Sequence, residues 1–362
     1  MLITGVKIWP CVQSLKDQEW KFSRSKISQI FGNILELTDD EGNSGFGYLH
    51  AIPAISTVHG AALAALEWMV PLLQERPIES LAETLVEIDK AIAGNTTAKV
   101  AIDMALHDLM SRRHQVSLTT LLGGVHRKRI KQARLLALKS PADMATNAAR
   151  VVQEGFGTIK LKFSGDEAQD IERIREVRSA VGSAVVITVD PNQAYTSKGF
   201  IRAFSRMDKY DIALVEQPVP AADWSGLALI TRALPVDIEA DESAQTVEDV
   251  FKLVSERAVD VVNIKLTKIG GFRNFMRAAQ ICEAGGIDCR VGAMFGPSLV
   301  QAAGVHAACL LRSDRHASEL SEHLHLDNDP FQALNVENGY IELPAGHGIG
   351  MGLQTTQPVE TA

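Results

Sequence analysis

The sequence predicts an α/β protein in which a closed barrel of parallel strands follows a smaller α+β unit. From residue 131 onward, short β-rich runs alternate with amphipathic helical runs, and charged residues stand at the ends of successive β-rich runs. The first 130 residues instead have the pattern of a strand meander followed by helices. We therefore expect two structural units, with a boundary near the Gly-Gly break and the basic cluster of 121–130.

The N-terminal unit is expected to contain three strands followed by three helices. A turn-rich DDEGNSG stretch separates the second strand from the third and is typical of a hairpin. The helices are predicted because apolar residues recur with a period near 3.6. The predicted strands are 1–9, 29–38 and 45–49, and the predicted helices are 55–75, 78–93 and 97–113.

The C-terminal unit contains eight predicted strands with helical spacers such as 166–181 and 246–257. Strands that alternate with helices form parallel sheets, and eight such units are typical of a closed (β/α)8 barrel. In that fold the carboxyl ends of all strands point to one shared site. The predicted strands are 133–138, 157–162, 185–190, 212–216, 236–241, 261–266, 288–293 and 316–320.

Composition excludes several classes of partner and location. The 362 residues include 36 basic and 44 acidic side chains, a net charge of −8, and no Lys/Arg cluster offsets the acidic excess, which argues against nucleic acid. The sequence contains no run of 18 apolar residues that could span a membrane, and its first residues lack a signal-peptide pattern. Four scattered cysteines suit a reducing compartment, so we expect a cytoplasmic protein. They are Cys11, Cys282, Cys289 and Cys309.

Charged and polar side chains end five successive predicted strands of the barrel. They recur at intervals of 24 to 28 residues, which is one βα unit each. Because alternate strand residues face opposite sides, the apolar neighbours pack on helices and the charged side chains point into the barrel mouth. The candidates are Lys160 and Lys162, Asp190 and Asn192, Glu216, Asp241, and Lys265.

Three of these candidates are carboxylates that would share one cavity. Burying unpaired charges costs several kcal/mol, so Asp190, Glu216 and Asp241 together require a cation. Three hard oxygen ligands suit Mg²⁺, whose octahedral shell leaves room for substrate oxygens and water. No His or Cys stands at these strand ends, which disfavours zinc.

Two lysines decide which chemistry we expect. Lys162 and Lys265 belong to the second and sixth predicted strands, which lie opposite each other in a ring of eight. Two opposed bases around a metal-held carboxylate suit removal of the proton α to it, through an ene-diolate that Mg²⁺ stabilises. The charges of Lys160 and of the metal would lower the pKa of Lys162 from about 10.4 toward the range useful to a base.

Other chemistries remain open on the residues alone. A metal site of this kind also suits a phosphate ester or a diphosphate, although the opposed lysines favour proton abstraction. A desolvated lysine at a barrel strand end is also the sign of a Schiff-base aldolase, which is the main alternative from a different class. A barrel that only binds or assembles would require a missing ligand, and all three carboxylates are present.

The strand-end motifs TIKLKFSGD, VDPNQ, LVEQP, ADES and NIKLTKIGG resemble the enolase superfamily, muconate-lactonizing-enzyme subgroup. The resemblance implies an N-terminal α+β capping domain (1–130), a modified (β/α)7β barrel (131–330) and a C-terminal segment that returns to the cap (331–362). It also implies a homo-oligomer and a small-molecule carboxylate as substrate. By position, Asp190, Glu216 and Asp241 would bind Mg²⁺, Lys162 and Lys265 would be the acid/base pair, Lys160 would tune Lys162, and Asn192 would support the metal shell.

The eighth predicted strand bears on the choice of substrate within the subgroup. Dipeptide epimerases tend to carry Asp-x-Asp there to hold a substrate ammonium, whereas this chain has Glu319-Leu320-Ser321. Glu319 would therefore either pair with one protonated amine, as in a single amino or imino acid, or assist Lys265.

Specificity is expected from a cap loop and from the seventh predicted strand. Trp20, Phe22 and Arg24 would close over the substrate, and Met294 and Phe295 would form an apolar wall. By general similarity the chain resembles the cis-3-hydroxyproline dehydratase branch, so we expect dehydration of a hydroxyproline, with epimerisation at the α-carbon as a competing outcome. The alternative within the subgroup is an amino acid or dipeptide racemase/epimerase or a cycloisomerase.

Overall fold

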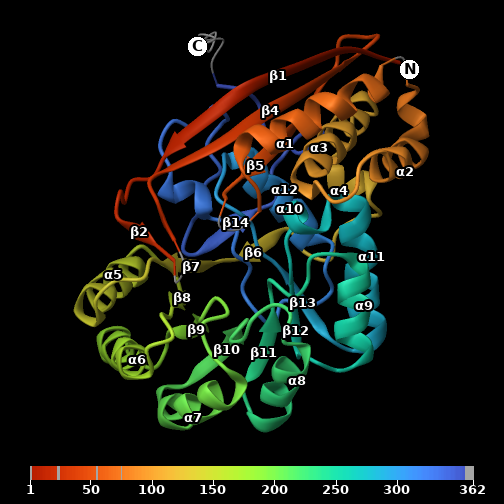
Figure 1. Ribbon diagram of the computed structural model, residues 1–362. Helices are drawn as coiled ribbons and strands as arrows, with labels where there is room; N and C mark the ends of the chain where they lie inside the picture. The colour runs from red at the N-terminus through yellow and green to blue at the C-terminus, as the bar shows by residue number, and fades with distance from the viewer. Residues whose placement is uncertain (1, 23–24, 54–55, 75, 355–362) are drawn as a thin grey trace.

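The computed structural model describes residues 2–22, 25–53, 56–74 and 76–354. Its N-terminal part is an antiparallel sheet in the order β1-β4-β5, and the predicted hairpin joins the last two strands. The sheet and its helices form one end of the molecule, above the barrel in Figure 1. The strands are β1 (Ile3–Ser14), β4 (Gln29–Asp39) and β5 (Ser44–Ala51).

The three predicted helices follow the sheet: two of them, α1 and α3, pack against it, and α2 packs against α3. The longest, α3, is buried along most of its length because two glycines of β5 let its backbone come close. A Cβ atom on Gly47 would lie only 1.9 Å from the carbonyl oxygen of Ala101 in α3. The helical segments are α1 (His59–Met69), η1 (Val70–Leu73), η2 (Ile78–Ser80), α2 (Leu81–Ala91), α3 (Thr96–Arg113) and α4 (Leu118–Leu121).

The second part is a barrel whose seven parallel strands follow one another around the ring in chain order. Apolar residues on the outward faces of these strands pack against the surrounding helices and form the main core. The strands are β7 (Ala133–Leu136), β8 (Thr158–Lys162), β9 (Val186–Asp190), β10 (Ile212–Glu216), β11 (Asp237–Ala240), β12 (Val261–Ile264) and β13 (Asp288–Val291).

A short eighth segment closes the ring between β13 and β7. Ser318 forms a parallel bridge with Gln132, and Glu319 forms one with Gly292. The predicted strand 316–320 is therefore reduced to two bridges, and no barrel helix follows it as far as Gln354, the last residue that the structure describes. The architecture is a (β/α)7β barrel with an N-terminal capping domain, as expected.

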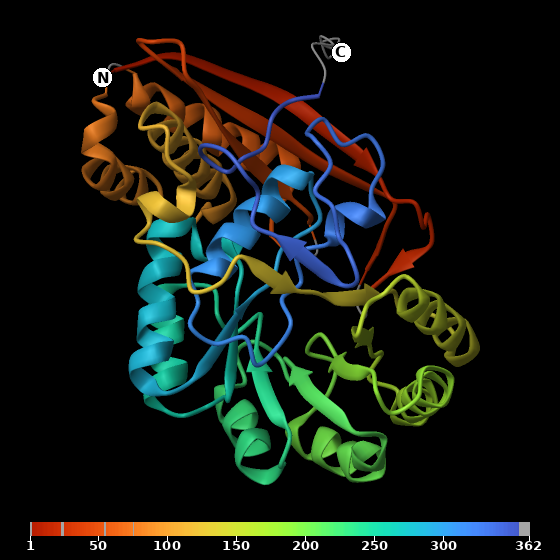
Figure 2. The ribbon, with the colours of Figure 1, turned by 180° about the vertical axis from the view of Figure 1, so that it is seen from behind.

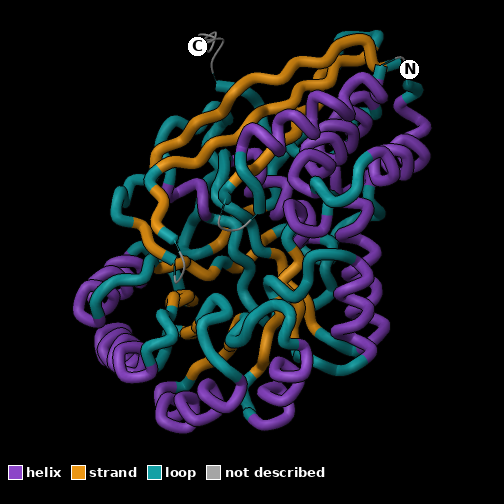
Figure 3. Tube along the Cα trace, viewed as in Figure 1, coloured by secondary structure: helices purple, strands orange, loops and turns teal. Residues whose placement is uncertain are grey.

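Helices surround the barrel on the outside, as Figures 2 and 3 show. Several begin where the sequence supplies an N-cap side chain that accepts a backbone N–H, for example Ser140, Asp166 and Thr246. The helical segments are α5 (Pro141–Gln153), α6 (Glu167–Val181), α7 (Ser197–Met207), η3 (Asp208–Tyr210), α8 (Trp224–Ala233), α9 (Val247–Ser255), α10 (Leu266–Ile269), α11 (Phe272–Gly285), α12 (Ser298–Cys309) and η4 (Glu322–His325).

The C-terminal segment contacts the cap between Tyr340 and Met351. Strand β14 (Tyr340–Glu342) pairs antiparallel with β6 (Arg129–Lys131), and Gly348 exchanges backbone hydrogen bonds with Val116 and Leu118. The domain limits at residues 130 and 330 stay predictions. None of the helices in the described ranges is long and apolar enough to cross a membrane.

A small hairpin of β2 (Trp20–Lys21) and β3 (Lys26–Ile27) reaches from the cap to the barrel. The backbone N–H of Leu138, just after β7, donates to the carbonyl of Lys21 at 3.1 Å. In Figure 1 this hairpin lies beside β7 at the barrel rim. The hairpin therefore places cap residues over the carboxyl ends of the first barrel strands.

Candidate active site

The barrel brings the predicted strand-end residues together. Lys160, Lys162, Asp190 and Glu216 are the inward-facing residues at the ends of β8, β9 and β10. The register pairs Lys162 directly with Asp190. Each of these side chains is at least nine-tenths buried, so their charges must be balanced by one another.

Lys160 is the centre of one ion-pair cluster. Its ammonium lies 2.5 Å from Glu216, 2.9 Å from Glu319 and 3.1 Å from Asp190. Burial alone would lower the pKa of Lys160, but these three carboxylates, Glu216 first, raise it well above its usual value. Lys160 therefore stays protonated. Lys162 itself donates a hydrogen bond to Asp190 at 2.5 Å. The effect of the Lys160 charge on the pKa of Lys162 stays a prediction.

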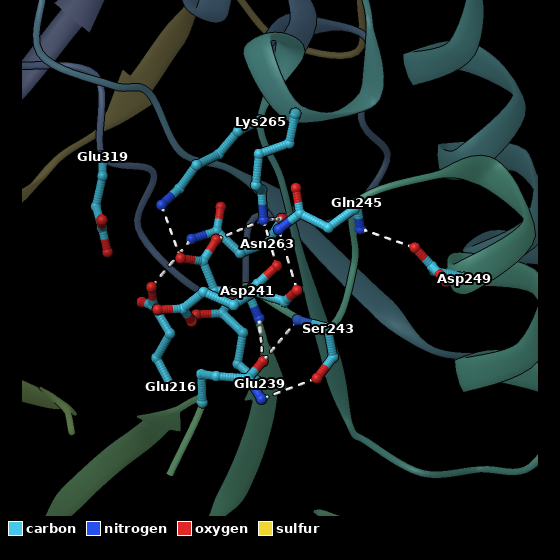
Figure 4. A network of polar contacts seen from close by, with 12 residues as sticks. Glu216, Glu239, Asp241, Ser243, Gln245, Asp249, Asn263, Lys265 and Glu319 are labelled. Atoms are coloured by element: carbon cyan, nitrogen blue, oxygen red, sulfur yellow. Dashed lines mark hydrogen bonds and ion pairs between the residues drawn. The ribbon is translucent and has the colours of Figure 1, made fainter. Parts of the chain in front are cut away.

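A second cluster surrounds Asp241, which follows β11. Lys265, at the end of β12, donates to one carboxylate oxygen at 2.9 Å, and Lys268 contacts the other at 2.6 Å. Figure 4 shows Lys265 directed at Asp241, with Glu216 and Glu319 nearby. Burial would lower the pKa of Lys265, but the carboxylates of Asp241 and Glu216 raise it above its usual range.

Two further barrel residues, Arg290 and Glu239, were not singled out from the sequence. The guanidinium of Arg290 in β13 binds Glu239 in β11 with two hydrogen bonds of 2.6 and 2.7 Å, and it lies 2.8 Å from Glu216 and 2.6 Å from Glu319. The strand alternation that revealed the lysines also places Arg290 and Glu239 on inward positions, so the same signal could have identified them.

Asn192 lies where the resemblance expects a helper of the metal shell. It adopts a left-handed backbone conformation with φ 45°. Its backbone N–H donates to one oxygen of Asp190 at 2.8 Å, and its side-chain amide donates to the other at 3.1 Å. Asn192 therefore orients Asp190.

The donor set fits a hard divalent cation. Asp190, Glu216 and Asp241 present carboxylate oxygens from three consecutive strand ends, the ligand type that Mg²⁺ prefers. Beside them, Glu242 has one buried carboxylate oxygen without a hydrogen-bond partner among the described residues. Burial and the charges of Asp241 and Asp190 raise the pKa of Glu242 to about 7, which marks a local excess of negative charge.

Lysine ammoniums neutralise these carboxylates in the structure. Among the described residues, no three Asp, Glu, His or Cys side chains are gathered around one metal-sized space. Lys160 lies between Asp190 and Glu216, and Asp241 is held by Lys265 and Lys268. The metal-ligand roles of the three carboxylates therefore stay predictions that rest on their chemistry and their place at the strand ends.

A cavity of about 270 Å³ opens above these clusters. Its walls combine all four buried lysines of the site with apolar residues from the cap and from the segment after β13, which suits a small carboxylate substrate. The lining residues used below are Phe22, Lys160, Lys162, Asp241, Glu242, Lys265, Lys268, Met294, Phe295, Glu319 and Glu322.

The predicted substrate-contacting residues divide into three groups. Phe22, Met294 and Phe295 line the cavity as expected, and the ring of Phe22 lies 5.6 Å from the ammonium of Lys162. Trp20 does not line the cavity, because its ring packs behind the wall against Phe295. Arg24 lies outside the described residues.

Glu319 was expected either to pair with a substrate amine or to assist Lys265, and these roles stay predictions. Both of its oxygens are engaged, one by Lys160 at 2.9 Å and the other by Arg290 at 2.6 Å. Burial would raise the pKa of Glu319, but Arg290 and Lys160 hold it well below its usual range. Glu319 is thus committed to the internal ion-pair network. Glu322, which the sequence analysis did not single out, also faces the cavity.

Comparisons with known proteins agree with this geometry. Residues 13–123 match the family model described as mandelate racemase/muconate lactonizing enzyme, N-terminal domain, and residues 143–357 match the model described as enolase C-terminal domain-like. The chain is 31% identical over 319 residues to an L-Ala-D/L-Glu epimerase from Clostridium acetobutylicum, covering 86% of this chain and 88% of the relative.

Two further proteins show the range of activities among its relatives. A chloromuconate cycloisomerase from Cupriavidus necator is 35% identical over 289 residues, which covers 79% of this chain and 78% of the relative. A dipeptide epimerase from Enterococcus faecalis, solved with Mg and the dipeptide L-Leu-L-Tyr, superposes with a TM-score of 0.93 at 30% identity, covering 97% of this chain and 99% of that chain. These relatives support the epimerase or cycloisomerase alternative over hydroxyproline dehydration.

Proposed function

Because the chain belongs to the mandelate racemase/muconate lactonizing enzyme family of the enolase superfamily, we propose that it racemises or epimerises a small, amino-acid-derived carboxylate. The α-proton would leave one face of the substrate and a proton would return to the other face. The epimerases among the relatives support this reaction, and dehydration of a hydroxyproline becomes a secondary possibility.

The observation that carries the proposal is the placement of two lysines. Lys162 ends β8 and Lys265 follows β12, four strands further round a closed ring of eight, and both line the same cavity. Two amines on opposite sides of one small cavity suit removal of a proton from one face and delivery to the other.

Each lysine is held by its own carboxylate, Lys162 by Asp190 and Lys265 by Asp241. A lysine must be neutral to take a proton and charged to give one. In one direction of the reaction one lysine therefore acts as the base and the other as the acid, and the roles are reversed in the other direction.

Magnesium held by Asp190, Glu216 and Asp241 would neutralise the substrate carboxylate and the negative charge that it gains as the α-proton leaves. The remaining polar residues hold this arrangement in place. Lys160 and Arg290 tie Glu216 to Glu319, and Asn192 orients Asp190.

The test is α-proton exchange in D₂O, followed by NMR for both stereoisomers of amino acids, N-acylated amino acids and dipeptides. Lys162→Ala and Lys265→Ala should each lose exchange of one stereoisomer by about 10²- to 10⁴-fold, because each removes the acid/base group of one face. EDTA should abolish exchange in the wild type. The exposed Lys198→Ala is the control and should retain full exchange.

Two outcomes would contradict the proposal. Exchange of both stereoisomers that persists in both lysine variants would remove the lysines from the reaction. Covalent trapping of substrate on a lysine by borohydride, with activity insensitive to EDTA, would instead favour the Schiff-base aldolase alternative.

A further inference from the structure

One carboxylate in the cavity wall has no hydrogen-bond donor among the described residues. Glu322 belongs to η4, is 3% exposed and lines the cavity. Among the described residues, neither of its oxygens has a hydrogen-bond partner. A buried carboxylate without a donor is costly, so such a group in a native fold requires an explanation.

The neighbouring basic groups do not supply the missing donor. The guanidinium of Arg134 donates to the carbonyl oxygen of Ser321 at 2.8 Å and lies 3.3 Å from Nδ1 of His325. The other ring nitrogen of His325 lies 3.7 Å from Glu322, beyond hydrogen-bond distance. Burial and Arg134 lower the pKa of His325 well below its usual value, so this ring is neutral.

The other carboxylates of the cavity differ from Glu322. Asp241 is paired with Lys265 and Lys268, and Glu319 is paired with Lys160 and Arg290. Glu242 lies among the carboxylates expected to hold the metal, and an amide of Asn192 lies 3.4 Å from it. Among these described cavity carboxylates, only Glu322 has no hydrogen bond to either oxygen. The strongest opposing charge that acts on it is that of Arg134, whose guanidinium donates to Ser321 instead.

Two aromatic rings, those of Phe22 and Phe295, line the same cavity as Glu322. The rings of Phe22 and Phe295 are 6.0 Å apart, and Phe295 lies 5.9 Å from His325, which in turn is 4.3 Å from Trp20. Aromatic faces attract cations, and the attraction strengthens when water is excluded. A carboxylate and aromatic rings that line one small cavity are the chemistry that recognises an ammonium group.

We propose that Glu322 is the anchor of a subsite for a protonated amine of the substrate, with Phe22 and Phe295 as its apolar wall. The substrate class is then a small carboxylate that also carries an ammonium or a protonated imino group. Its carboxylate would face the ammonium of Lys265, and its amine would face Glu322. A dicarboxylate such as a muconate would instead meet a like charge, so Glu322 argues against cycloisomerisation.

This inference rests on the proposed function, because it defines the substrate of the same cavity. The test uses matched probes that differ only in the amine: L-proline and L-Ala-L-Glu, each beside its N-acetyl derivative. Binding is followed by calorimetry and α-proton exchange by NMR, both with the magnesium-loaded full chain. The variants are Glu322→Gln, which removes the charge, Glu322→Asp, which keeps it, and Asp327→Asn as an exposed control.

We expect at least one amine-bearing probe to bind about tenfold more tightly than its N-acetyl derivative. Glu322→Gln should remove that preference, mainly through KM rather than kcat. Glu322→Asp should retain part of it, and Asp327→Asn should leave it unchanged.

The outcomes separate this subsite from the proton-transfer chemistry. Exchange of N-acetyl probes that equals or exceeds that of the amines would overturn the subsite and leave the racemase proposal standing. Amine binding that depends on Glu322, without exchange, would support the subsite and contradict the proposed reaction. Binding of no amine-bearing probe, or binding that Glu322→Gln does not weaken, would overturn the subsite.

Discussion

Glu319 and Glu322 are three residues apart, yet their carboxylates have opposite surroundings. Glu319 is held by Lys160 and Arg290, which keep its pKa well below the usual range. Glu322 is equally buried but has no such partners, and burial raises its pKa to about 7. At the residue scale, the charge state of a side chain therefore depends on which cations the barrel brings to it.

This difference predicts a pH dependence of stability. As pH rises from 4.5 to about 7, unfolded Glu322 loses its proton while the folded form retains it. The stability contributed by the protonated form is therefore complete below pH 4.5 and is lost as pH rises through 7, a change of about 3 kcal/mol. Urea unfolding of the wild type and of Glu322→Gln between pH 4 and 8 measures it.

As the pH rises from 4 to 8, the free energy of unfolding of the wild type should decrease relative to that of Glu322→Gln. Asp327→Asn is the control, and its difference from the wild type should stay constant. Parallel pH curves for the wild type and Glu322→Gln would show that Glu322 ionises normally in the folded protein.

At the scale of elements, the cap depends on close contact between α3 and β5. Gly47 allows this contact, since a Cβ atom there would lie 1.9 Å from the carbonyl oxygen of Ala101. That neighbour is backbone and cannot rotate away, so the helix would have to shift.

We therefore expect Gly47→Ala to lower the free energy of unfolding by about 1–3 kcal/mol, as overpacking does. Gly60→Ala is the matched control, because a Cβ atom at Gly60 in α1 would have no neighbour within 4 Å and alanine favours helix. Urea denaturation of both variants measures the effect. Equal stability of the two variants would contradict the proposed close contact.

At the scale of the whole molecule, one buried aspartate joins the cap to the C-terminal segment. Asp108 in α3 accepts the backbone N–H of Phe46 at 2.9 Å and that of Ile349 at 2.7 Å. Arg112, one turn further along α3, donates to Asp108 at 2.9 Å and to the carbonyl oxygen of Met351 at 2.7 Å.

Replacing Asp108 by alanine should destabilise the protein by about 3–5 kcal/mol, because it leaves two buried N–H groups and the charge of Arg112 without their partner. It should also release the C-terminal segment, which limited proteolysis followed by mass spectrometry would detect. Asp314→Ala, at an exposed site, should change neither property. Protease resistance like that of the wild type in Asp108→Ala would show that other contacts hold the segment.

The barrel and its strand-end residues follow from the sequence because they depend on local periodicity. Alternation along each strand determines which side chains face inward, and a spacing of one βα unit brings successive strand ends to one edge. The same signal would have found Arg290 and Glu239. It could not have found Glu322, which lies in η4 after the bridge of Glu319 that closes the barrel, where no strand alternation applies.

By itself, the sequence determined the two-part architecture, the ring of strands and the lysines and carboxylates at their ends. Only the tertiary structure decided how those charges pair: that Arg290 and Lys160 engage Glu319, that Trp20 lies behind the cavity wall, and that Glu322 accepts no hydrogen bond from the described residues. The physical reason is that ion pairing and desolvation depend on distances between strands far apart in the chain, which no local pattern encodes.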